Sequence, residues 1–110
     1  LSQPVEAVEI RYDIAEEEGD GRDYKEYGTW LLASFREYAA ADSRFRIVEP
    51  NYEGIRIAFD DEEVKGWLLM RKSLHDPVIP MNIESSVPGG IDIIYGRIRP
   101  FIEKCRRLKR

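Results

Sequence analysis

A short segment between two apolar runs carries the side chains best suited to chemistry in this chain. It extends from Arg71 to Pro77 and reads R-K-S-L-H-D-P. Arginine offers a planar fork of N–H donors that matches phosphate oxygens, and a serine hydroxyl or a histidine ring nitrogen donates a further hydrogen bond. Backbone N–H groups in a turn add more donors. These residue types predict a loop that binds phosphate or a similar anion.

The segment lies where a hairpin would present it. Apolar residues run from 67 to 70 and again from 78 to 83, which predicts two strands joined by this loop. Side chains alternate between the two faces of an extended chain. Arg71 and Ser73 are therefore expected on one side and Lys72 on the other, so Lys72 is left out of the predicted site.

Hydrophobic periodicity predicts the elements that position this loop. Residues 8–14 alternate between apolar and charged types, which is typical of a strand with one buried face. A capping-box pattern at Asp23 and apolar residues at spacings of three and four predict a helix over residues 24–41. An apolar stripe over residues 91–105 predicts a last helix, which Pro100 is expected to kink or end.

The remaining apolar runs complete a sheet. A second strand begins at residues 45–48, is interrupted at Pro50 and resumes over residues 54–59. Pro80 lacks an N–H donor, so its strand is expected at a sheet edge or with a bulge. The order β-α-β-β-β-α predicts an α+β two-layer sandwich, with a four-stranded antiparallel sheet and two helices on one face. Residues 1–110 are expected to form a single domain.

Composition restricts the classes of function. The net charge of −4 argues against nucleic acid as the main partner. The single cysteine, Cys105, has no partner for an internal disulfide, which favours a reducing, cytoplasmic compartment. No apolar run approaches the roughly 18 residues that a membrane span needs, so no membrane partner is expected.

The loop and its flanking strands resemble a known family. They are similar to the fourth, C-terminal domain of the α-D-phosphohexomutases, the phosphomannomutases and phosphoglucomutases. In that family the substrate-phosphate loop reads R-x-S-[GN]-T-E-P after a G-W-x-x-x-R strand. Leu74 stands where the family has Gly or Asn, and His75 stands where it has Thr. The shared frame consists of Gly66, Trp67, Arg71, Ser73, the acidic Asp76 and Pro77.

The resemblance implies a fold similar to half of the TATA-binding protein and a place at the C-terminal end of a longer enzyme. A start at Leu1 fits such a piece, although a trimmed tag would look the same. The family interconverts hexose 1-phosphates and hexose 6-phosphates through a bisphosphate, which makes its members isomerases of carbohydrate metabolism. Their phosphoserine and their Mg²⁺ belong to other domains. The expected partners of this chain are a hexose phosphate and those other domains.

The resemblance also implies a role for each loop residue. Arg71 would clamp the substrate phosphate that is not reacting, and Ser73, His75 and the backbone N–H of Leu74 would donate to it. No catalytic residue, metal site or cofactor is expected within this chain, so the isolated chain is expected to be inactive.

Three other features favour ordinary structural roles. The segment Glu18 to Arg22 reads E-G-D-G-R, but a magnesium loop needs three alternating carboxylates, so a solvated turn is expected. The basic run from Arg97 to Arg110 is expected to be a charged tail. Cys105 falls on the apolar stripe of the last helix and is expected to be a core thiol.

A different class of function remains open, namely a non-catalytic α+β module that binds a protein through its sheet or its last helix. Upstream coding sequence with a T-A-S-H-N-P-like serine motif and a D-G-D-G-D-R-like loop would support the enzyme. A native start within a few residues of Leu1 would support the module. The identity of the hexose is not encoded in this chain, because the sugar-reading residues of the family lie in another domain.

Overall fold

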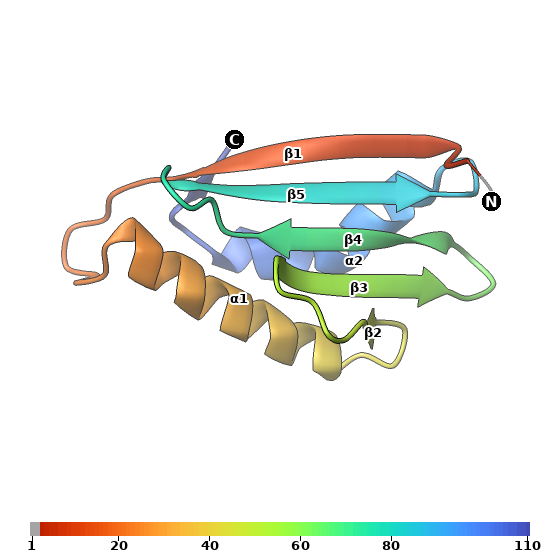
Figure 1. The fold of residues 1–110 in the computed structure, drawn as a ribbon, viewed down its shortest axis with the longest axis horizontal. Helices are drawn as coiled ribbons and strands as arrows, with labels where there is room; N and C mark the ends of the chain where they lie inside the picture. The colour runs from red at the N-terminus through yellow and green to blue at the C-terminus, as the bar shows by residue number, and fades with distance from the viewer. Residues whose placement is uncertain (1–2) are drawn as a thin grey trace.

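A six-stranded sheet in the order β2-β3-β4-β5-β1-β6 is the framework of the fold (Figure 1). The computed structural model describes residues 3–110, and within them all five strand pairings are antiparallel. The α+β class and the two helices are confirmed, but the sheet has six strands instead of the predicted four. The elements are β1 (Glu6–Ile14), α1 (Tyr24–Ala40), β2 (Arg46–Ile47), β3 (Gly54–Asp60), β4 (Lys65–Arg71), β5 (Val78–Ser85), α2 (Gly90–Lys104) and β6 (Leu108–Lys109).

The first additional strand, β2, comes from a reversal of the chain. A single interrupted strand was expected here, but β2 folds back and pairs with β3, so that Ile47 lies opposite Ile57. The Asn51 side-chain oxygen accepts hydrogen bonds from the N–H groups of Glu53 at 2.9 Å and Gly54 at 3.1 Å. An asparagine that bonds the backbone two residues on stabilises a turn. The segment around Pro50 and Asn51 therefore separates two strands, β2 and β3, instead of interrupting one.

The second additional strand, β6, shows that the basic C-terminal run is not simply a charged tail. Leu108 lies opposite Ile14 at the edge of the sheet. Beside it, the Arg107 side chain is only 4% exposed. It donates to the carbonyl of Ala15 at 2.7 Å and to the carbonyl of Arg22 at 3.0 Å. This end of the chain is thus fastened to the loop that follows β1.

That loop was expected to be a solvated turn; it is a turn with Glu18, Gly19 and Gly21 exposed, but the Asp20 and Arg22 side chains are paired with each other. The Asp20 side chain is 9% exposed and accepts from Arg22 at 2.7 Å and from Arg107 at 3.0 Å. The hydrogen bond from Arg22, followed by that from Arg107, holds the pKa of Asp20 below its usual value. A metal loop would need its third carboxylate at the position of Arg22. Arg22 instead forms an ion pair with Asp20.

One face of the sheet carries the core. Alternate side chains of β1, β3, β4 and β5 pack against the apolar faces of both helices, and α2 passes behind β4 in Figure 1. The rings of Phe35 in α1 and Phe101 in α2 lie 5.3 Å apart and join the two helices. Cys105 is buried, as predicted, and burial raises the pKa of its thiol to about 11. No helix among residues 3–110 is long and apolar enough to cross a membrane.

Two prolines lie in the predicted strand and helix, but Pro80 is not at a sheet edge and Pro100 is not at a helix end. Pro80 does not mark an edge, because β5 lies between β4 and β1. It falls between the last β4–β5 pair, Met70 and Met81, and the bond from the Ser73 N–H to the Val78 carbonyl, so its missing N–H interrupts the pairing only at this point. Pro100 does not end α2, which continues to Lys104. Burial of the apolar face of this helix against the sheet outweighs the lost backbone bond.

We expect the buried Arg107 to be essential for stability and its neighbour Arg106 to be dispensable. Arg107→Met should lower the free energy of unfolding by at least about 2 kcal/mol, because the two carbonyl groups lose their charged donor. The Arg106 side chain is 81% exposed and has one ion pair, with Glu17, so Arg106→Met should change stability by less than about 0.5 kcal/mol. Urea denaturation of both variants measures the difference. Equal losses would contradict the structural role of Arg107.

Candidate functional site

The predicted anion loop is the connection between β4 and β5. β4 ends at Arg71 and β5 begins at Val78. Beyond the end of β4, the N–H of Ser73 donates to the Val78 carbonyl at 3.3 Å, which continues the hairpin pairing in the same register. The loop is therefore anchored at its base, and its tip extends past the end of the sheet.

Pairing of the two strands sends Arg71 and Lys72 to opposite faces, as the alternation predicts. The Lys72 ammonium donates to the Thr29 hydroxyl of α1 at 2.9 Å. Its methylene groups lie along Gly28, where a β-carbon would come 3.0 Å from Lys72 Cδ. Sequence reasoning treats a glycine inside a helix as a cost in stability. Here the glycine lets the Lys72 stem cross the helix and hold the loop against α1.

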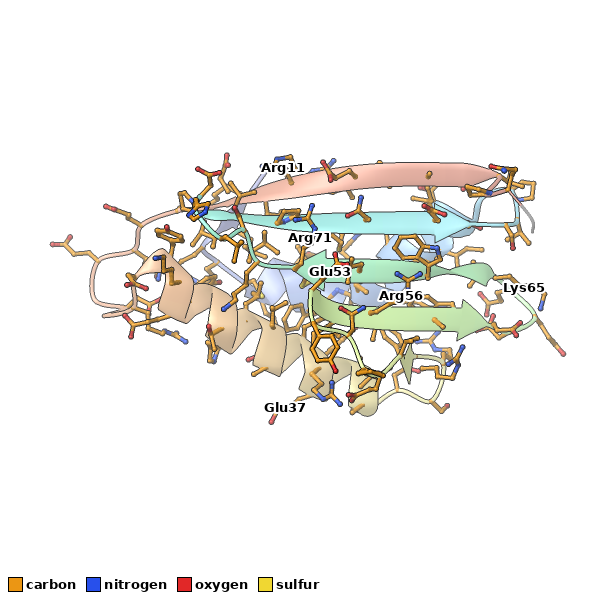
Figure 2. All side chains as sticks on the ribbon, in the orientation of Figure 1. Arg11, Glu37, Glu53, Arg56, Lys65 and Arg71 are labelled. Atoms are coloured by element: carbon orange, nitrogen blue, oxygen red, sulfur yellow. The ribbon has the colours of Figure 1, made fainter. Side chains whose placement is uncertain are left out.

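Arg71 lies on the open face of the sheet, which no helix covers within residues 3–110; Figure 2 looks onto this face. Its side chain is 33% exposed, and its nearest carboxylate, that of Glu9 on β1, is 3.7 Å away. Across from it on β3 is Gly54, where a β-carbon would collide with the Met70 carbonyl and with Arg71 itself. The close approach of the two backbones therefore requires glycine beside Arg71.

The loop offers several donors near its tip. The Ser73 hydroxyl accepts from the N–H of Asp76 at 3.3 Å, so its own proton remains available for a ligand. The Leu74 side chain is 80% exposed, and the N–H groups of Leu74 and His75 have no acceptor within residues 3–110. Tyr24 of α1 donates to the His75 carbonyl at 3.3 Å and supports the tip from below. The predicted site residues thus lie in one connection but not on one face: Ser73 and Leu74 line a hollow with Lys72 against α1, whereas Arg71 lies beside Glu9 on the open face.

Two residues near Arg71 were missed by the sequence analysis. Arg11 lies on β1, on the same open face (Figure 2). Glu9 is on the same strand, and one of its oxygens is 3.8 Å from an Arg11 nitrogen. The alternation of residues 8–14 already placed both on the polar face of their strand. This alternation does not show that β1 pairs with β5, and that pairing brings Glu9 and Arg11 next to Arg71.

The arrangement offers hydrogen-bond donors suited to an anion, and in the part of the chain that the structure describes no serine or cysteine side chain is hydrogen-bonded to a histidine or a carboxylate. Within residues 3–110, no group of histidine, cysteine, aspartate and glutamate side chains is placed to hold a metal ion. Neither a family model nor a curated protein matches the chain. Assignment of the site therefore depends on the residue pattern from Gly66 to Pro77 and on the geometry described above.

Ser73 should act as an internal brace of the loop. In Ser73→Ala the Asp76 N–H loses its acceptor, so its hydrogen exchange should accelerate about fivefold, as expected for the loss of one hydrogen bond. Ser43→Ala is the matched control, because Ser43 is exposed and lies far from this hairpin in the sequence. Amide exchange followed by NMR measures both variants. Unchanged exchange at Asp76 in Ser73→Ala would show that the hydroxyl does not order the loop.

Proposed function

We propose that this chain is the substrate-phosphate-binding domain of a phosphohexomutase, an enzyme that interconverts hexose 1-phosphates and hexose 6-phosphates. One observation carries the proposal. Arg71 is a partly exposed guanidinium without a hydrogen bond to a carboxylate, and it begins an R-x-S-x-x-D-P loop with unused N–H donors at its tip. Lys72, at the x position between Arg71 and Ser73, is held on the other side of the sheet by its bond to Thr29.

In this function the loop contributes position and charge. The Arg71 fork would bind two phosphate oxygens, while the Ser73 hydroxyl and the N–H groups of Leu74 and His75 would donate to the others. Phosphoryl transfer depends on alignment and charge neutralisation, which such contacts supply without covalent chemistry. The phosphoserine and the magnesium ion of the reaction would belong to other domains of the parent enzyme.

The two departures from the family pattern are compatible with this role. Leu74 is 80% exposed. Leucine in place of glycine keeps the backbone N–H, and in place of asparagine it also keeps that N–H and removes the side-chain amide donor. His75 is exposed, and its ring can donate from a nitrogen where the family pattern has a threonine hydroxyl.

Titration of the chain with inorganic phosphate tests the assignment. We expect weak binding, at about millimolar level, because few contacts hold the ligand and no second domain closes over it. NMR shifts should be largest at the Arg71 side chain and at the amides of Leu74 and His75. Arg71→Met should abolish these shifts. Lys72→Met is the matched control: it removes one charge but keeps the stem that packs on Gly28, and should leave the shifts in place.

Two results would contradict the assignment. Shifts that persist in Arg71→Met would show that the guanidinium is not a ligand. Shifts confined to the basic residues between Arg97 and Arg110 would indicate attraction of the anion to general positive charge, which fits the non-catalytic module better.

In the parent enzyme the same pair of variants should separate in activity. Loss of the bidentate contact in Arg71→Met should lower kcat/KM for a hexose phosphate about thirty- to a hundredfold, equivalent to roughly 2–3 kcal/mol. Lys72→Met should retain most of the activity. Steady-state kinetics on folded enzyme measures both, and an Arg71→Met enzyme with near-wild-type kcat/KM would remove the basis of the proposed function.

A further inference from the structure

The arginines of this chain differ in how completely their donors are used. Arg97 is 5% exposed and donates to both oxygens of Asp61, at 2.8 and 3.3 Å. Arg107 is equally buried, and its donors are used by a carboxylate and two carbonyls. Arg11 and Arg71 are different. Each lies 3.7–3.8 Å from an oxygen of Glu9, beyond hydrogen-bond distance, and their side chains are 53% and 33% exposed.

The sheet holds these two arginines on either side of one residue. Arg11 is the β1 partner of Pro80. Arg71 follows the last β4–β5 pair, Met70 with Met81, and therefore flanks Pro80 from the other strand. Because neighbouring strands are about 5 Å apart, two long side chains on one face can reach over the strand between them. Figure 2 shows Arg11 and Arg71 on this face, from β1 and β4.

Glu9 lies in the next cross-strand row, opposite Asn82. One oxygen of its carboxylate is near Arg71 and the other is near Arg11, so a single anion is shared by two guanidinium groups. Its one hydrogen bond within residues 3–110, from the Asn82 amide, is long at 3.5 Å, and its side chain is 42% exposed. This carboxylate is therefore held only loosely between the two guanidinium groups.

We propose that Arg11 is the second arginine of the phosphate site, and that Glu9 is an internal competitor whose carboxylate lies between Arg11 and Arg71 until a phosphate displaces it. The inference rests on the proposed function, because Arg71 belongs to both. A phosphate monoester carries up to two charges and three acceptor oxygens, against one charge and two oxygens for Glu9. It satisfies two forks better than the carboxylate does. Displacement costs little, because exposed ion pairs are weak.

The arrangement has a consequence for selectivity. Without ligand, Glu9 offsets part of the positive charge of the pair, which lowers its attraction for small monoanions. A phosphate dianion competes with Glu9 more effectively than a carboxylate or chloride does. Glu9 thus favours phosphate esters over other anions at the cost of some affinity.

Titration of inorganic phosphate into four single variants of the full chain tests the inference, with NMR shifts of the Leu74 and His75 amides as the readout. Glu9→Gln should tighten binding about two- to fivefold, as expected when one exposed charge is removed. Arg11→Met should weaken binding about threefold or more. The controls change the same charges on the same face. Glu84→Gln alters a carboxylate of β5 that lies opposite Trp67, and Arg56→Met alters an arginine stacked 4.1 Å from the Trp67 ring. Both should bind phosphate as the wild type does.

The outcomes separate this inference from the proposed function. Equal effects of Glu9→Gln and Glu84→Gln, or of Arg11→Met and Arg56→Met, would overturn it, because only the overall charge of the face would then matter. If Arg71→Met abolishes binding while the Glu9 and Arg11 variants bind as the wild type does, the inference fails and the proposed function stands. If Arg71→Met has no effect, both fail.

Discussion

The pairing of β4 with β5 determines on which face of the sheet the side chains at the start of the candidate loop lie. Its last contact is the bond from the Ser73 N–H to the Val78 carbonyl, at 3.3 Å. This register sends Arg71 to the open face and Lys72 to α1, where Thr29 receives its ammonium group. A slip of one residue would exchange the two faces. Lys72 would then lie on the open face and Arg71 would pack against the helix, so the candidate site requires the observed register.

Four arginines of this chain differ in burial and in their hydrogen bonds. Arg97 and Arg107 are buried and hydrogen-bonded and serve the fold: Arg97 joins α2 to the β3–β4 turn, and Arg107 joins the C-terminal segment to the loop after β1. Arg11 and Arg71 are partly exposed and only loosely paired with Glu9. Burying a charge without partners costs free energy, whereas an exposed charge is solvated by water and costs little when it has no protein partner. The net charge of −4 does not show which arginines are buried and paired and which are exposed.

The sequence was sufficient for the features that depend on local patterns. The capping box at Asp23, the two helices and the division of Arg71 from Lys72 all follow from periodicity within one element. It was insufficient where distant segments meet. The strand β6, the burial of Arg107 and the approach of Glu9 to Arg71 depend on strand pairings that no local pattern specifies. The separate strand β2 could be predicted only in part, because Pro50 and Asn51 indicate a turn but not the direction of the chain after it.

The central claim is that an oxyanion of the phosphate type binds at Arg71, beside the tip of the β4–β5 loop. The most direct measurement is a crystal structure of the chain grown with arsenate, a phosphate analogue whose anomalous scattering locates it independently of any prior interpretation. The account predicts an anomalous peak on the open face of the sheet, within hydrogen-bond distance of the Arg71 guanidinium, with the Glu9 carboxylate displaced from its place between the two arginines. A peak found only beside the basic residues from Arg97 to Arg110, with none at Arg71, would contradict it.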